Sequence, residues 1–159
     1  MEKIKIKKLL SVMKKLRDPK KGCPWDKKQT METIIPHSIE EVYEVAEQIY
    51  KRDYNRLKEE LGDLLFQVVY LSQIASEKNK FNFSDVVNNI TSKMIDRHPH
   101  VFKNKKFKNL KEFNLWWEDS KNKKQESILD SIPFTYPALL EANKIQKKVA
   151  SVGFEYEND

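Results

Sequence analysis

The segment "LGDLLFQVVYLSQIA", residues 61–75, constrains the fold more than any other part of the chain. Its apolar residues occupy nearly all sides of a helix, and such a helix is buried under a second helical layer or a second subunit. Asp63 lies inside this segment, and Glu60 precedes Asp63 by one helical turn. Because an unpaired carboxylate at a packed interface costs several kcal/mol or becomes neutral, both acids need a partner.

The remainder of the chain predicts an all-α fold. The 159 residues include only three glycines, and no alternating run is bounded by hairpin signals. Loops are expected over residues 17–30 and 98–108, which contain prolines. Helical periodicity and stop signals predict helices over residues 4–16, 38–50, 54–77, 84–98, 110–121 and 138–149.

Capping patterns place the starts of four of these helices. Ser38 stands three residues before Glu41, which is a capping-box arrangement, and Asp53 can cap the next helix. Ser84 and Asn109 are expected to cap two later helices. The helices that follow Ser38 and Asp53 therefore form an antiparallel hairpin with a tight turn.

Composition and charge narrow the class of protein. With 39% hydrophobic and 34% charged residues, the chain is expected to be a soluble folded protein rather than a disordered or membrane protein. A lone Cys23 and a lysine-rich start without a cleavage site predict a cytoplasmic location. The net charge of +6 fits either an anionic partner or a general lysine bias. The basic runs lack the aromatic pattern of nucleic-acid readers, so no nucleic-acid or membrane partner is expected.

Two pairs of acids in the hairpin suggest a metal site. At 100° per residue, Glu41 and Glu44 lie on the side of their helix opposite its apolar stripe. If the hairpin brings this pair against Glu60 and Asp63, four carboxylates converge with no lysine or arginine between them. A bound cation would stabilise such a cluster, and oxygen ligands without Cys or His favour Mg²⁺ or Mn²⁺ over zinc.

Other interpretations of the same acids remain open at this point. Glu41 can be only the capping-box acid, and Glu59 and Glu60 can be acids that favour the N-terminal end of their helix dipole. A di-iron bundle is a rival metal site, but it expects Glu-x-x-His pairs. This hairpin instead offers Glu-x-x-Glu and Glu-x-x-Asp.

Several motifs in a fixed order resemble a known family. "EEVYE" followed by "EELGD" resembles the E-E-x-x-E … E-x-x-D signature of the MazG family of all-α nucleoside triphosphate pyrophosphohydrolases. "LRDPKKGCPWDKKQT", "RHPHVF", "WWEDSK" and "PALLEANKIQKKVASVGFEY" are also similar to MazG motifs. The resemblance extends from about Leu16 to Tyr156. The chain is similar to the N-terminal half of MazG proteins that contain two such modules.

The resemblance implies an architecture. Helical hairpins would form a core like a four-helix bundle, completed by dimerisation. A single domain over residues 1–159 would comprise an N-terminal helix and GCPWD loop (1–37), a metal-binding hairpin (38–78), nucleotide-contact helices (84–125) and a C-terminal helix with a tail (126–159).

The resemblance also implies roles for individual acids. It makes Glu41, Glu44, Glu60 and Asp63 the Mg²⁺ ligands. Glu40 and Glu59 become candidates for binding a second ion or orienting water. Because such chemistry needs no protein nucleophile, the expected role of Cys23 is loop packing.

Positively charged and aromatic residues are candidates for nucleotide contacts. Lys93 and Arg97 are four residues apart on one helix face, and Trp117 and Lys121 repeat this spacing. The resemblance implies that these four residues, together with Arg56 and Trp25, contact the substrate. The structural alternative is a set of solvated cations around a core tryptophan. His98 and His100 are expected to organise a helix end.

The expected activity is Mg²⁺-dependent hydrolysis of nucleoside triphosphates between the α and β phosphates, with broad base tolerance. It would yield a monophosphate and pyrophosphate and would clear noncanonical or surplus nucleotides. One alternative is a narrower enzyme acting on dUTP, dCTP or phosphoribosyl-ATP. A second alternative is a non-catalytic helical module that binds nucleotide or a partner protein.

Overall fold

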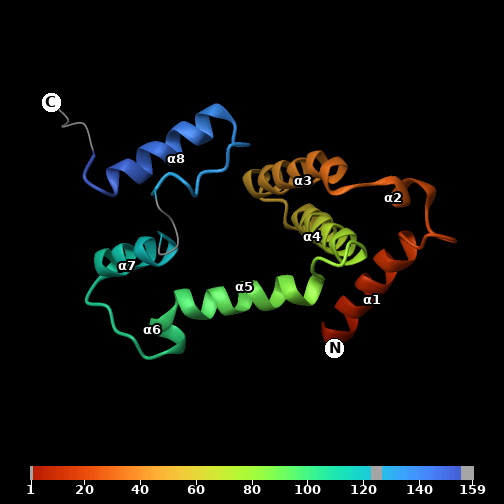
Figure 1. Ribbon diagram of the computed structural model, residues 1–159, viewed down its shortest axis with the longest axis horizontal. Helices are drawn as coiled ribbons and strands as arrows, with labels where there is room; N and C mark the ends of the chain where they lie inside the picture. Colours follow the sequence, from red (N-terminus) through yellow and green to blue (C-terminus); the bar gives the residue numbers. More distant parts are fainter. Residues whose placement is uncertain (1, 123–126, 155–159) are drawn as a thin grey trace. The chain divides into compact units, whose positions relative to one another are not determined.

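The computed structural model describes residues 2–122 and 127–154, which contain helices and no strand (Figure 1). The predicted all-α fold is therefore confirmed. The helices are α1 (Glu2–Leu16), α2 (Pro24–Lys28), α3 (Met31–Lys51), α4 (Tyr54–Glu77), α5 (Phe83–Arg97), α6 (Pro99–Phe102), α7 (Leu110–Asn122) and α8 (Ala138–Ala150). No helix in this described part is both long and apolar enough to cross a membrane.

The chain divides between Ser92 and Lys93 into two compact units. The expectation of one domain over residues 1–159, with its four subdivisions, stays a prediction. Residues 123–126, where the third and fourth subdivisions meet, and residues 155–159, at the end of the fourth, lie outside the described residues.

Several predicted helix ends are confirmed by their capping contacts. Asp53 Oδ1 accepts hydrogen bonds from the backbone amides of Asn55 and Arg56, at 3.2 and 3.1 Å, and α4 ends at Glu77 as expected. Asn109 Oδ1 accepts a bond of 2.9 Å from the Glu112 amide at the start of α7. These side chains satisfy backbone donors that have no partner inside the helix.

The predicted start of the hairpin's first helix at Ser38 is wrong. α3 begins at Met31, and Thr30 forms its capping box with Thr33. Pro36 lies inside α3, where it removes one backbone donor near the N-terminal end without stopping the helix. The Ser38 hydroxyl donates to the Ile34 carbonyl within the helix at 3.1 Å. Glu41 is therefore not a capping-box acid.

Three further expectations need correction. α5 is capped by Asn82 rather than Ser84, because Asn82 Oδ1 accepts the Ser84 amide at 2.8 Å. The two predicted loops each contain a short helix, α2 and α6. Each of these helices begins with proline, whose fixed φ angle suits the first helical position.

The core of the first unit gathers around the C-terminal half of α4. α3 and α1 both pack against α4 (Figure 1). The buried cluster consists of Met13, Ile34, Val69, Tyr70 and Ile74. Removing these apolar side chains from water fixes the three helices relative to one another.

A polar network attaches α2 to this core. The Tyr70 hydroxyl lies 2.9 Å from the Asp26 carbonyl oxygen and 3.0 Å from its carboxylate. Burial raises the pKa of Tyr70 to about 12, so the hydroxyl keeps its proton and remains a donor. Arg17 binds both Glu77 carboxylate oxygens and donates to the Asp26 and Gln29 carbonyls. The segment before α3 is therefore held on α4.

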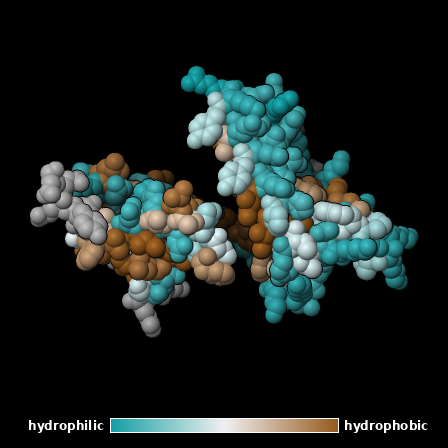
Figure 2. Space-filling model, turned by 90° about the horizontal axis from the view of Figure 1, so that it is seen from above, coloured by the Kyte–Doolittle hydropathy of each residue, from teal (hydrophilic) through white to brown (hydrophobic). Residues whose placement is uncertain are grey.

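The apolar faces of the hairpin are only partly covered. Ile39 and Val42, which belong to the apolar stripe of α3, are each 52% exposed. On α4, Leu61 and Leu65 are 50% and 40% exposed, so the expected burial on all sides is not achieved within this unit. Figure 2 shows hydrophobic residues, in brown, reaching the molecular surface. The α3 surface that packs toward α4 is instead the one that carries Glu41.

Candidate active site

The α3–α4 hairpin brings acids from both helices together. Glu41 on α3 and Glu60 and Asp63 on α4 each offer a carboxylate oxygen, and these oxygens lie within 4.8 Å of one another. Glu41 and Glu60 are half-buried, whereas Asp63 is exposed. We call these three residues the acidic cluster. The antiparallel packing places one turn of α4 opposite Glu41.

Glu44 lies outside this group of three but close enough to influence it. Burial is the largest cause that raises the pKa of Glu60, and the negative charge of Glu44 is the next. The charges of Asp63 and Glu41 act in the same direction. These neighbours therefore disfavour the ionised form of Glu60.

No described lysine or arginine forms a salt bridge with the acidic cluster. Arg56, a predicted substrate contact, is largely exposed and lies 4.0 Å from Asp53. The neutral side chain of Gln67 instead contacts the cluster, because its Nε2 donates to Glu41 Oε1 at 3.2 Å. Gln67 belongs to no sequence motif, although its position four residues after Asp63 places both on one face of α4.

The structure does not place Glu40 and Glu59 in the acidic cluster. Both are exposed, and Glu40 Oε2 lies 3.3 Å from Nδ1 of His37. His37 also contacts the ring of Trp25 edge-on, with a centroid distance of 5.9 Å. Trp25 is 53% exposed, so it retains a free surface beside α3.

Other predicted substrate contacts lie in the second unit. The guanidinium of Arg97 lies 5.5 Å from the ring centroid of Trp117, in a cation–π contact. Lys93 is exposed on α5. Lys121 lies in α7, but its side chain is outside the described residues.

The two histidines near Pro99 belong to an aromatic cluster. Nδ1 of His98 lies 2.7 Å from the Met94 carbonyl, and its ring contacts Trp117 at a centroid distance of 5.2 Å. The ring of His100 contacts Phe113 at 4.9 Å. These contacts fit the expected role at a helix end.

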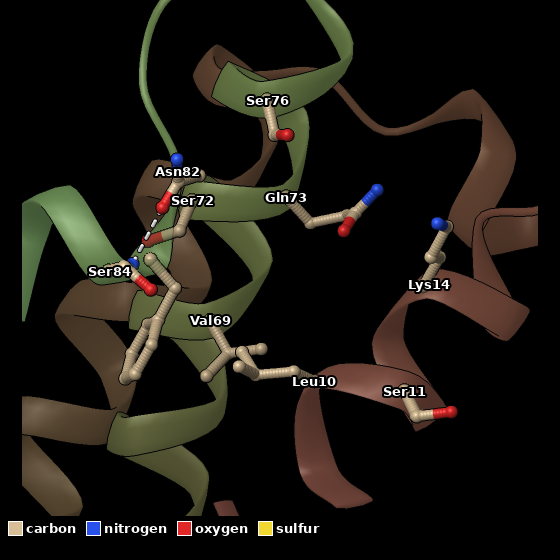
Figure 3. A pocket seen from close by; sticks show the side chains of 10 residues that line it. Leu10, Ser11, Lys14, Val69, Ser72, Gln73, Ser76, Asn82 and Ser84 are labelled. Carbon is tan, nitrogen blue, oxygen red and sulfur yellow. Dashed lines mark hydrogen bonds between the residues drawn. The ribbon is translucent and has the colours of Figure 1, made fainter. Parts of the chain in front are cut away.

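A separate hollow of about 290 Å³ lies between α1, α4 and the start of α5 (Figure 3). Leu10 and Val69 form part of its wall. The hydroxyl of Ser72 donates to the Val68 carbonyl, and Asn82 accepts the Ser84 amide, so these polar groups bond within their own segments. No member of the acidic cluster lines this hollow.

Comparisons with known proteins bear on the same helices. Residues 29–102 match the family model described as the MazG nucleotide pyrophosphohydrolase domain. Over 156 residues the chain is 48% identical to a nucleoside triphosphate pyrophosphohydrolase of Escherichia coli, a match that covers 95% of this chain and 59% of that protein. The chain contains a MazG domain.

Two Thermotoga maritima proteins extend the comparison. A nucleoside triphosphate pyrophosphohydrolase/pyrophosphatase MazG is 43% identical, over 94% of this chain and 58% of that protein. The crystal structure of a mazG-related protein matches with a TM-score of 0.60 and 28% identity, covering 73% of this chain and 98% of the other. The chain thus spans less than two thirds of these E. coli and T. maritima pyrophosphohydrolases. The matched MazG domain includes the acidic cluster but not Trp117 or Lys121.

We expect Glu60→Gln to stabilise the protein at neutral pH when divalent ions are absent. The pKa of Glu60 is raised in the folded state, so its stability contribution is present below the unfolded pKa and is lost as the pH rises through the folded pKa. The amide does not ionise and avoids this loss. Urea unfolding in EDTA measures the free energy of unfolding. Glu60→Gln should increase it, relative to the unaltered chain, more at neutral than at acidic pH.

Glu47→Gln provides a control of opposite sign. The hydrogen bond with Lys51 lowers the pKa of Glu47, so this acid stabilises the fold above its unfolded pKa and loses that contribution as the pH falls. Its amide variant should lose stability at neutral pH. If Glu60→Gln loses stability as Glu47→Gln does, the repulsion assigned to the acidic cluster is absent.

Proposed function

We propose that this MazG chain is a Mg²⁺-dependent nucleoside triphosphate pyrophosphohydrolase. The observation that carries the proposal is the acidic cluster, in which three carboxylate oxygens from α3 and α4 lie within 4.8 Å of one another. In the described part of the chain no cation forms a salt bridge with them. The names of the E. coli and T. maritima relatives support the reaction class.

The donor set fits a hard divalent cation. Glu41, Glu60 and Asp63 offer only oxygen ligands, and Glu44, whose negative charge helps to raise the pKa of Glu60, is the proposed fourth carboxylate. Such ligands suit Mg²⁺, with Mn²⁺ as the alternative. The di-iron alternative lacks support, because the described group contains no histidine. Glu40 and Glu59 remain candidates for a second ion or for orienting water.

The proposed reaction breaks the anhydride between the α and β phosphates. Water oxygen bonds to the α phosphorus, pyrophosphate leaves, and a nucleoside monophosphate remains. Bound Mg²⁺ would neutralise phosphate charge and lower the pKa of water. The half-buried Glu41 and Glu60 would hold the ion, while Lys93 and Arg97 would bind phosphate oxygens. Trp117, Trp25, Arg56 and Lys121 are the other proposed substrate contacts.

We expect Glu41→Gln and Asp63→Asn each to abolish hydrolysis while the helices remain folded. Each change removes a charged ligand from the acidic cluster without altering its size. Pyrophosphate release with Mg²⁺ and circular dichroism check the two parts of this expectation. Asp85→Asn, which alters an exposed acid at the start of α5, should retain activity. Full Mg²⁺-dependent turnover by either cluster variant would refute the site.

The same assay across a nucleotide panel tests base tolerance. We propose broad tolerance, with similar rates for several ribo- and deoxyribonucleoside triphosphates. A single strongly preferred substrate would support the narrower alternative, such as a dUTP, dCTP or phosphoribosyl-ATP enzyme. Nucleotide binding without hydrolysis would support the non-catalytic module.

Lys93→Ala and Arg97→Ala should mainly weaken nucleotide binding. Charge-assisted contacts to phosphate are worth about 1.5 to 3 kcal/mol each, so each variant should lose affinity by that amount. Titration with a nonhydrolysable triphosphate measures the loss. Lys103→Ala is the matched control, because Lys103 pairs with Asp96 on the surface. Unchanged affinity would make Lys93 and Arg97 solvated surface residues.

We propose that a second copy of the chain covers the apolar faces of α3 and α4. The exposed apolar residues repeat at helical spacing on both helices and include Ile35, Ile39, Val42, Leu61, Leu65 and Val68, which are 39–52% exposed. Exposed apolar surface of this kind marks interaction sites, and most soluble oligomers contain identical subunits. The expected cytoplasmic location and the absence of nucleic-acid or membrane partners stay predictions.

Sedimentation should show a dimer for the unaltered chain and a monomer for Val42→Lys. The lysine places an uncompensated charge on the face that the second copy would bury. Val12→Lys, on α1, makes the same change at a residue that is 41% exposed and should leave the dimer intact. A monomeric unaltered chain would refute this proposal.

A further inference from the structure

Gln67 contacts the acidic cluster without belonging to it. It follows Asp63 by one turn of α4, and its Nε2 donates to Glu41 Oε1 across the hairpin at 3.2 Å. Its other polar atom, Oε1, is buried and has no hydrogen-bond partner in the described part of the chain. The contact with Glu41 is thus the amide's only hydrogen bond that the described residues supply.

The orientation of this amide follows from chemistry. A carboxylate oxygen accepts hydrogen bonds, and the NH₂ end of Gln67 faces Glu41 Oε1. That orientation leaves the amide oxygen unpaired, and an unpaired buried oxygen costs free energy. Gln48 also has an unpaired buried Oε1, but its Nε2 lies 3.5 Å from Glu47 rather than near the cluster. What distinguishes Gln67 is that its one described hydrogen bond goes to a member of the acidic cluster.

A neutral donor has an effect that a cation would not have. It fixes one oxygen of Glu41 while leaving the charge of the carboxylate uncompensated. A lysine or arginine at this position would form a salt bridge with Glu41 and would repel a divalent ion. Residues that hydrogen-bond to metal ligands fix the ligands' orientation in this way.

We propose that Gln67 is a positioning residue, which holds Glu41 so that its carboxylate stays directed into the acidic cluster. This inference rests on the proposed function, because it assumes that the cluster binds a divalent cation. Gln67 would touch neither substrate nor the reacting atoms, and it would act through Glu41 alone.

The test compares Gln67→Met with Gln73→Met in the full chain. Gln73 lies on the same helix, and its Nε2 donates to Glu77 Oε1 at 2.9 Å, outside the cluster. The two variants therefore lose the same kind of glutamine–glutamate bond. Electron paramagnetic resonance of free Mn²⁺ measures affinity, and thermal melting in EDTA measures the fold without metal.

Gln67→Met should bind Mn²⁺ about 10- to 100-fold more weakly than the unaltered chain. Gln73→Met should bind as the unaltered chain does. The melting temperature of Gln67→Met in EDTA should not fall below that of Gln73→Met, since Gln67→Met also removes the unpaired oxygen. This combination separates positioning of a ligand from general packing.

The outcomes distinguish this inference from the function on which it rests. If the unaltered chain fails to bind Mn²⁺, or if Glu41→Gln binds as well as the unaltered chain, the proposed metal site and this inference both fail. If Glu41→Gln loses binding but Gln67→Met keeps it, only the positioning role is overturned. Weaker binding together with a melting temperature in EDTA far below that of Gln73→Met would mean a packing role and would also overturn it.

Discussion

Repulsion among carboxylates is the constraint on which the first unit depends. Glu41 faces Glu60 and Asp63 without a neutralising lysine or arginine among the described residues. The buried residues of α4 all lie in its C-terminal half, from Val69 onward, whereas the acids lie in its N-terminal half. The buried core at the C-terminal end of α4 therefore holds the acids of α3 and α4 together against their mutual repulsion.

The segment before α3, which contains α2, also has one buried residue and one exposed residue side by side. Tyr70 and Arg17 bind Asp26 from the core, where hydrogen bonds satisfy its buried carbonyl. The adjacent Trp25 remains largely exposed and reaches His37 on α3. Asp26 thus anchors the segment, and its neighbour Trp25 stays accessible beside α3. A binding residue on an anchored segment loses little conformational freedom when it meets a ligand.

Sequence spacing predicted those features that depend on one helix. The shared face of Glu60 and Asp63 and the Asp53 cap follow from periodicity and capping rules. α3 begins before the predicted Ser38 because Thr30 and Thr33 form a cap through two hydroxyl groups and Pro36 does not stop the helix. The apolar stripe of α3 that includes Ile39 and Val42 stays half exposed in this unit, because an apolar stripe does not reveal which partner covers it. Gln67 belongs to no sequence motif, and only its contact with Glu41 across the hairpin links it to the acidic cluster.

The turn between α3 and α4 consists of Arg52 and Asp53 alone, whereas Arg17 and Glu77 are 60 residues apart. The entropy lost when a chain closes a loop grows with the number of residues enclosed. Bringing the two halves of the hairpin together thus restricts far less of the chain than returning α1 to the end of α4. The acids that face one another therefore lie on consecutive helices joined by a tight turn. Their contact closes one of the shortest loops between helices in this unit.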